Sequence, residues 1–236
     1  MDIKCSLAMT AAEYLGAEVM PKNMAWMACH YSGSGLGLSN LPQTLPTDSV
    51  VIMDDSAPPQ EQDPELILHQ LKALTQQLQV SALLLDFQRP DITENAQLAA
   101  LLVSRLPCPV CVSGYYAMDL DCPVFLPPPL LHQPLADHLA PWKGREIWLE
   151  AALEAEEVTV TAEGSTVTPL PFLPLAENSF VSEELHCRYR IRVEDDRAVF
   201  TLARDGEMIK SLLASSKRQG VTQAVGLYQQ LGSHFL

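Results

Sequence analysis

Short apolar runs recur along this chain, and polar side chains follow most of them. The clearest run, Ala82–Leu85, continues into the sequence DFQRP, whose proline stops it. A run this short, bounded by proline, predicts a strand buried on both faces of a parallel sheet. Because side chains alternate along a strand, Asp86 and Gln88 share one side, while Leu85 and Phe87 take the other.

Eight such runs are predicted strands, and helical patterns separate some of them. Asp63-Pro64 opens one predicted helix in the preferred capping order, and Asp91 with Glu94 is predicted to cap the next. The fourth and fifth runs are too close for a full helix between them. The predicted strands are Met24–His30, Ser49–Asp54, Ala82–Leu85, Pro109–Ser113, Pro123–Leu126, Arg145–Ala151, Ala198–Ala203 and Gln223–Tyr228.

This spacing predicts an α/β fold, namely an abbreviated (β/α)8 TIM-like barrel with some helices missing. Glu157–Thr168 has the pattern of a hairpin around Glu163-Gly164, so we expect an inserted β-hairpin region. The main alternative is a doubly wound open sheet. Its nucleotide-binding version is disfavoured because no G-x-G-x-x-G follows a predicted strand. No long linker divides the chain, and we expect residues 1–236 to form a single domain.

Two local signals predict helix ends, and one strand carries a regular charge pattern. Thr10 and Glu13 have the spacing of a capping box, for a helix that Pro21 would end. Gly220 predicts the end of a helix that begins at Gly206. Cys187–Val193 reads as a strand whose alternating arginines mark a solvated face rather than an anion site. These arginines are Arg188, Arg190 and Arg192.

The amino-acid composition argues against several classes of binding partner. The formal net charge of -14 argues against nucleic acid or an anionic membrane, since both bind clustered Lys and Arg. No stretch of about 18 uncharged apolar residues predicts a membrane span. The first residues do not resemble a secretory signal. The six cysteines need no disulfide framework in a chain of 236 residues, so we expect reduced thiols and a cytoplasmic protein.

Neither a redox motif nor a metal site is expected. Cys108 and Cys111 have C-x-x-C spacing, but in a strand their sulfurs would lie on opposite faces, which favours buried structural thiols. The histidines show no H-x-x-x-H spacing, and no cofactor is predicted. The glycines at 33, 35 and 37 precede no predicted helix, so they indicate a loop rather than a phosphate site.

The polar residues that follow the strands are the candidate ligand-binding residues. In a barrel, the carboxyl ends of the strands meet at one mouth. Carboxylates, amides and aromatic rings facing one cavity suit a carbohydrate-like or small polar ligand. Each of these residues could instead point outward or cap a helix. The predicted ligand-binding residues are His30, Tyr31, Asp54, Gln88, Arg89, Tyr115, Tyr228 and Gln229.

One stretch resembles a known family. The sequence LLLDFQ is similar to the strand end with the D-x-x-D-x-D-x-E signature in chitinase-like, family 18 glycoside hydrolases. Asp86 aligns with the last Asp and Gln88 with the final Glu. The resemblance implies a (β/α)8 barrel in which the Glu protonates the glycosidic oxygen and the Asp assists the substrate's acetamido group. Here the earlier Asp positions hold Ser81 (or Val80) and Leu84.

The replacement of the acid by Gln88 changes the expected chemistry, because an amide cannot act as a general acid. We therefore expect a glycosidase-related barrel that binds a ligand at its mouth and is catalytically degenerate. One alternative is an active glycoside hydrolase with Asp86 and Glu150 as catalytic residues, since glycosidases use two carboxyl groups. Another is a non-catalytic scaffold or interaction protein, in which Asp86 has only a capping or hydrogen-bonding role at the strand end.

Overall fold

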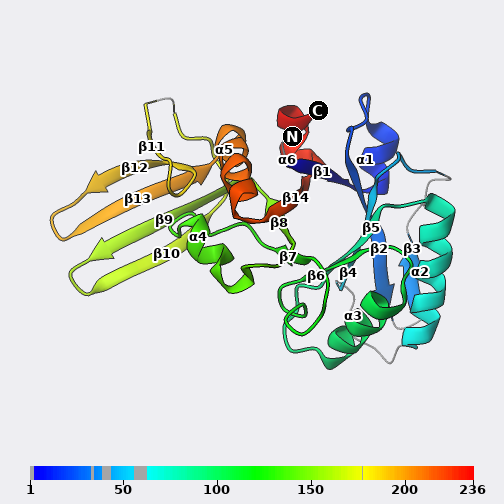
Figure 1. Cartoon of the computed structure of the whole chain (residues 1–236). Helices are drawn as coiled ribbons and strands as arrows, with labels where there is room; N and C mark the ends of the chain where they lie inside the picture. The colour runs from blue at the N-terminus through cyan, green and yellow to red at the C-terminus, as the bar shows by residue number, and fades with distance from the viewer. Residues whose placement is uncertain (1–2, 33–34, 39–43, 56–62, 177) are drawn as a thin grey trace. The chain divides into compact units, whose positions relative to one another are not determined.

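The computed structural model describes residues 3–32, 35–38, 44–55, 63–176 and 178–236 (Figure 1). The chain divides into two compact units. The barrel unit contains Lys4–Leu126, Arg145–Glu150 and Thr222–Leu236. The sheet unit contains Pro127–Gly144 and Ala151–Val221, together with the first residues of the chain. That residues 1–236 form a single domain stays a prediction.

The barrel unit is a closed ring of eight parallel strands, with β14 beside β1 to complete the ring. The predicted abbreviated barrel is therefore confirmed, and the open-sheet alternative is wrong. A short strand, β3 (Gly35–Leu38), pairs antiparallel with β2. The ring consists of β1 (Lys4–Met9), β2 (Met24–Ser32), β4 (Val50–Asp54), β5 (Ala82–Asp86), β6 (Val110–Ser113), β7 (Val124–Leu126), β8 (Ile147–Ala151) and β14 (Val221–Leu227).

Seven of the eight predicted strands lie in this ring, and one prediction is wrong. Ala198–Ala203 belongs to β13 (Arg197–Arg204), a strand of the sheet unit. Its place in the ring is taken by β1, for which the sequence predicted no strand. The sequence of β1, KCSLAM, has no β-branched residue and no clear alternation, so its local signal is weak. Parallel pairing with both β14 and β2 holds it in the ring.

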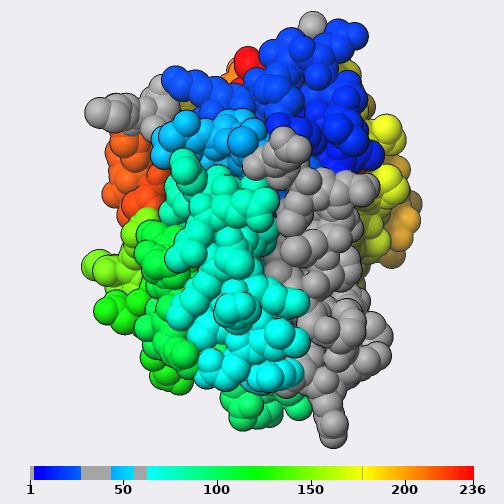
Figure 2. Space-filling model, turned by 90° about the vertical axis from the view of Figure 1, so that its right-hand side faces the viewer, coloured from blue at the N-terminus to red at the C-terminus, as the bar shows by residue number. Residues whose placement is uncertain are grey.

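Helices cover part of the outside of the barrel, and local capping explains where two of them begin. In α1 (Ala11–Gly16) the predicted capping box is present, with Glu13 N donating to Thr10 Oγ1 at 3.3 Å. In α2 (Pro64–Leu78) the predicted cap is confirmed, since Glu65 N donates to Asp63 Oδ1 at 3.0 Å. Figure 2 shows the side of the barrel unit on which α2 and α3 lie next to each other.

Two predicted helix boundaries are wrong. Helix α1 stops at Gly16, well before Pro21. In α3 (Thr93–Arg105) the N-cap is Ile92, which makes no side-chain capping bond. Asp91 instead has a φ of 61°, so it forms part of the turn before the helix. The last helix of this unit, α6 (Tyr228–Phe235), follows β14 directly.

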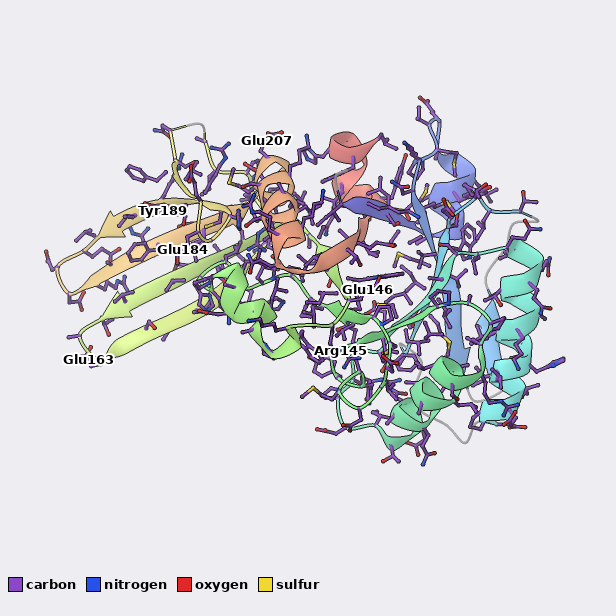
Figure 3. All side chains as sticks on the ribbon, viewed as in Figure 1. Arg145, Glu146, Glu163, Glu184, Tyr189 and Glu207 are labelled. Atoms are coloured by element: carbon purple, nitrogen blue, oxygen red, sulfur yellow. The ribbon has the colours of Figure 1, made fainter. Side chains whose placement is uncertain are left out.

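The connection between β6 and β7 contains no helix in residues 114–123, all of which are described, as the strand spacing predicts. A single side chain, that of Arg145, binds several of its backbone carbonyls. Arg145 Nη1 donates to Ala117 O at 2.8 Å, and Nη2 donates to Cys122 O at 2.8 Å and to Leu120 O (Figure 3). The guanidinium thus replaces hydrogen bonds that a helix would make internally.

The sheet unit contains the inserted β region, which is larger than the predicted hairpin. Its five antiparallel strands lie in the order β10-β9-β13-β12-β11. The predicted hairpin is confirmed, with Gly164 at a φ of 145° in its turn. Besides β13, the strands are β9 (Glu154–Thr161), β10 (Gly164–Leu170), β11 (Phe180–Ser182) and β12 (Cys187–Val193).

Helical segments complete the sheet unit. They are α4 (Leu135–Leu139), η1 (Ala140–Trp142), α5 (Gly206–Ser216) and η2 (Lys217–Gln219). Gly220 has a φ of 99° and ends the last of them, as predicted. In the described parts of the whole chain, no helix has the length and apolar character to cross a membrane.

Candidate functional site

The side chains at the ends of β4 and β5 continue the alternation that fills the barrel interior. Ile52 of β4 and Leu84 of β5 belong to a buried cluster formed by alternate residues of the ring strands. Asp54 and Asp86 come two positions later, and the two residues are direct neighbours in the parallel register. Because alternate residues face the same side, both carboxylates belong to the interior-facing set at the mouth.

Asp86 is a perturbed carboxyl group. Burial raises its pKa, and the negative charges of Asp54 and Asp55 raise it further, while a hydrogen bond from Gln88 opposes the shift. In that bond Gln88 Nε2 donates to Asp86 Oδ1. Asp86 and Gln88, which are predicted to share one side of the strand, therefore contact each other directly. Gln88 itself is exposed.

Glu150 lies two positions after an interior residue of another ring strand, β8. Trp148 of β8 belongs to the same interior cluster, and its indole Nε1 donates to Glu146 Oε1 at 3.2 Å. The predicted shared face of Glu146, Trp148 and Glu150 is consistent with this contact. Glu150 is half-buried at the carboxyl end of β8, on the interior-facing set of positions. Its pairing with Asp86 in catalysis stays a prediction.

Asp55, the residue after Asp54, organises the loop that follows β5. It is only 3% exposed, and its carboxylate accepts hydrogen bonds from Gln88 N at 3.0 Å, Arg89 N at 3.2 Å and Asn95 Nδ2 at 2.8 Å. Arg89 Nε also lies 3.4 Å from Asp55 Oδ2. The Arg89 side chain, predicted to bind ligand, therefore contacts a protein carboxylate and helps to hold this loop.

Tyr116 holds the other side of the same loop. Its hydroxyl accepts a hydrogen bond from Ile92 N at 3.1 Å and donates to Arg89 O. Its ring contacts Phe87 edge to face, with ring centroids 6.1 Å apart. Tyr115, predicted to bind ligand, is 58% exposed in the turn after β6. Of the two adjacent tyrosines, Tyr116 is therefore the one that shapes the loop carrying Gln88.

Four other predicted ligand-binding residues lie on β2 and α6. His30 and Tyr31 are in β2, where His30 is the register partner of Asp54. His30, Asp54 and Asp86 thus form one row across three neighbouring strands. Tyr228 and Gln229 begin α6, and Tyr228 lines a hollow of about 590 Å³ with residues of α1 and the turn after it.

The two thiols of the C-x-x-C motif are held in their protonated form. Burial raises the pKa of Cys108, and raises that of Cys111 well above its ordinary value. Cys111 is part of the buried barrel interior, as the prediction of a buried structural thiol requires, whereas Cys108 is only half-buried and lies before β6. Within the described residues, His, Cys, Asp and Glu form no group of three that could hold a metal ion. Gly33, of the glycine-rich stretch, lies outside those residues.

Asp55 and Tyr116 are the residues whose roles the sequence did not predict. The sequence places Asp55 beside Asp54 and Tyr116 beside Tyr115, without separating the neighbours. For Asp54 and Asp55, the alternation of side chains along β4 is a signal that could have separated their roles. Met53 and Asp55 share the side opposite to Ile52 and Asp54, which points Asp55 away from the barrel interior.

Solved structures share this fold along nearly the whole chain. A family 18 N-acetylglucosaminidase from Paenibacillus barengoltzii matches with a TM-score of 0.63 and 12% identity, covering 100% of this chain and 98% of that one. The spore cortex-lytic enzyme SleL of Bacillus cereus matches with a TM-score of 0.57 and 9% identity, covering 99% and 74%. The barrel has the fold of the chitinase-like glycoside hydrolases.

A plant enzyme belongs to the same group of structures. The family 18 chitinase of Cycas revoluta, solved as a mutant with (GlcNAc)4, has a TM-score of 0.57 and 9% identity, covering 97% of this chain and 95% of that one. No protein-family model and no curated protein matches the sequence. At these identities the likeness concerns the fold, and function has to be argued from the site.

Proposed function

We propose that the barrel binds a carbohydrate-like ligand at the mouth of its strands and lacks the general acid of a glycosidase. The observation that carries this proposal is the contact between Gln88 and Asp86 at the end of β5. The chitinase-like signature has its acid at the position of Gln88. An amide there can bind a substrate, but it has no ionisable proton to give to a leaving group.

The polar groups of Asp54, Asp86 and Gln88 suit hydroxyl and amide groups of a sugar. Because Gln88 Nε2 donates to Asp86, its Oε1 can accept a hydrogen bond from a ligand. The carboxylates of Asp54 and Asp86 offer further acceptors on neighbouring strands. One solved structure of similar fold contains (GlcNAc)4 and another contains allosamidin, which supports an amino sugar as the first ligand class to test.

A second candidate is an active glycoside hydrolase that uses Asp86 and Glu150. The raised pKa of Asp86 favours it, since a carboxyl group that keeps its proton nearer to neutral pH is a better general acid. In this version Asp86 protonates the glycosidic oxygen, and the carboxylate of Glu150 acts as base or nucleophile.

Calorimetric titration with N-acetylglucosamine oligomers, combined with product analysis by mass spectrometry, separates these functions. We expect the wild-type protein to bind without hydrolysis, and Asp86→Ala to lose binding. Asp119→Asn, which removes an exposed carboxylate from the β6–β7 connection, is the matched control and should bind normally.

Two outcomes would contradict the proposal. Hydrolysis by the wild-type protein that disappears in both Asp86→Asn and Glu150→Gln would establish the second candidate. Absence of binding to every oligosaccharide tested, with the fold intact by circular dichroism, would leave the scaffold alternative.

A further inference from the structure

The five-stranded sheet of the sheet unit has one face on which apolar residues form a continuous row. Val167 of β10 is the register partner of Val158 of β9, which also pairs with Phe200 of β13. Phe200 in turn pairs with Ile191 of β12. Direct register partners lie side by side on one face, so these four side chains are neighbours across four strands. With Val160, they are called the apolar face below.

The apolar face is accessible. Val160 is 40% exposed, Val167 is 42% exposed and Ile191 is 46% exposed. A hollow of about 380 Å³ lies over the apolar face. Leu202, which lines this hollow, forms a buried cluster with Leu131 and Cys187. The residues that line the hollow include Val158, Val160, Tyr189, Ile191, Phe200 and Leu202. An exposed apolar surface of this kind is typical of a binding site.

The basic residues of β12 lie on the opposite face of the sheet. Arg188, Arg190 and Arg192 alternate with Tyr189 and Ile191, which line the hollow. Arg188 Nε lies 2.7 Å from Asp205 Oδ2, and Arg192 Nε lies 2.9 Å from Glu194 Oε1. Among the described residues that line the hollow there is neither Lys nor Arg. The arginines of β12, predicted to be solvated, therefore lie on the face of the sheet opposite to the apolar face.

Acidic residues lie at the edges of the apolar face. Glu163 is in the turn between β9 and β10, and Figure 3 shows it at the far end of that hairpin. Asp195 and Asp196 are in the turn between β12 and β13. Glu183 and Glu184 come between Ser182 and Leu185, two residues that line the hollow. All five acidic residues are exposed.

We propose that this face docks an amphipathic, basic peptide segment of a partner protein. Its apolar side chains would cover Val158, Ile191 and Phe200, and its Lys or Arg residues would meet the acidic edge. Electrostatic complementarity of this kind speeds encounter and selects the partner. A second copy of the chain fits poorly, because two acidic edges would face each other in a protein with a net charge of -14. The proposal is independent of the sugar site.

Fluorescence polarisation tests this with the full chain and two labelled helical peptides, one of Leu and Lys and one in which Glu replaces every Lys. We expect only the Leu/Lys peptide to bind, with affinity that falls but persists as salt increases. Val160→Asp and Val167→Asp should weaken binding about tenfold or more. Thr166→Asp is the matched control, since it adds the same charge to β10 on the opposite face and should change binding little.

Circular dichroism checks folding of each variant, and Val167→Asp on the edge strand β10 keeps the test usable if Val160→Asp does not fold. Equal changes in Val167→Asp and Thr166→Asp would overturn the proposal, because binding would then not depend on which face of β10 carries the substitution. Self-association of the wild-type chain that Val167→Asp abolishes would overturn it in favour of a second copy. Binding of N-acetylglucosamine oligomers that Val167→Asp abolishes would make this face a sugar site instead.

Discussion

Adjacent residues at the end of β4 have different roles because strand side chains alternate. Asp54 belongs to the interior-facing set and is the register partner of Asp86. Asp55 is buried and binds the backbone of the loop after β5. Asp54 thus lies beside Asp86 at the end of the strands, while Asp55 shapes the loop that carries Gln88.

The ionisation of Asp86 opposes folding at neutral pH. Its pKa is raised, chiefly by burial, so the folded protein holds this proton more tightly than the unfolded chain. The contribution of Asp86 to stability is therefore greatest at low pH, and it falls as the pH rises from about 3.9 through the folded pKa. We expect Asp86→Asn to raise the midpoint of urea unfolding at pH 7, and the gain to shrink towards pH 4.

Asp119→Asn provides the control for Asp86→Asn, because it removes an exposed carboxylate from the same unit. Its unfolding midpoint should stay within error of wild type. A lower midpoint for Asp86→Asn at pH 7 would mean that the negative charge of Asp86 is stabilising.

Removing the Asp55 carboxylate should release the loop after β5. Asp55→Ala removes one acceptor of Asn95 Nδ2 and the side-chain acceptor of the Gln88 and Arg89 amides, and each lost hydrogen bond of a buried or partly buried donor costs about 1–3 kcal/mol. We expect a loss of about 2–4 kcal/mol in urea unfolding. Hydrogen exchange at the two amides should accelerate, whereas exchange in α2 should change only with global stability.

At the scale of elements, a cap is predictable when its signal lies within one turn. The caps of α1 and α2 follow from Thr10 and Asp63, whose side chains bind amides two or three residues later. The same reasoning fails for α3, because Asp91 adopts a left-handed conformation in the turn before Ile92. Local chemistry thus makes a cap possible, and the path of the preceding loop decides whether it forms.

The start of α5 depends on one carboxylate with two partners. Asp205 accepts a hydrogen bond from Met208 N at 3.0 Å and contacts Arg188 Nε at 2.7 Å. Burial alone would raise its pKa, but these bonds outweigh burial and lower it. Asp205→Ala should cost about 1–2 kcal/mol, and Asp205→Asn less, since asparagine also caps helices.

The pH dependence checks the role of Asp205. Because its folded pKa is lowered, its contribution is present above the unfolded pKa of about 3.9 and is lost as the pH falls through the folded pKa. The difference between wild type and Asp205→Ala in thermal unfolding should therefore narrow at acid pH. An equal difference at pH 3 and pH 7 would contradict this account.

At the scale of the whole molecule, the two units have different cores. The barrel interior is almost entirely apolar, with Leu84, Phe125 and Trp148 among its residues. The sheet unit instead buries a charge. Arg204 is fully buried, with Nη1 donating to Glu154 Oε2 at 2.6 Å and to Pro129 O at 2.9 Å.

Replacing this arginine should destabilise the chain strongly. Arg204→Met leaves Glu154 and several carbonyls without a partner, and breaking a buried ion pair in this way costs about 3–5 kcal/mol. The double variant Arg204→Met/Glu154→Gln should recover part of that loss in urea unfolding. No recovery would show that the carbonyl contacts of Arg204, rather than its ion pair, account for its contribution.

From the sequence alone follow the barrel strands with clear apolar runs, the missing β6–β7 helix, the caps of α1 and α2 and the shared strand side of Asp86 and Gln88. These features depend on residues within a few positions of one another, so composition and alternation reveal them. Tertiary structure alone decided that Lys4–Met9 closes the ring and that Ala198–Ala203 belongs to the sheet unit. Strand pairing depends on partners far apart in the chain, and no local pattern encodes it.

The same distinction holds for the candidate site. The residue types expected at the mouth follow from what comes after each strand, so the sequence predicts Asp54, Asp86 and Gln88 there, and their role in binding stays a prediction. The contacts of Arg89 with Asp55 and of Tyr116 with Ile92 join residues 24 or more positions apart. Hydrogen bonds between such distant groups exist only once the strands have brought them together, and for that reason only the tertiary structure could assign these side chains to the loop.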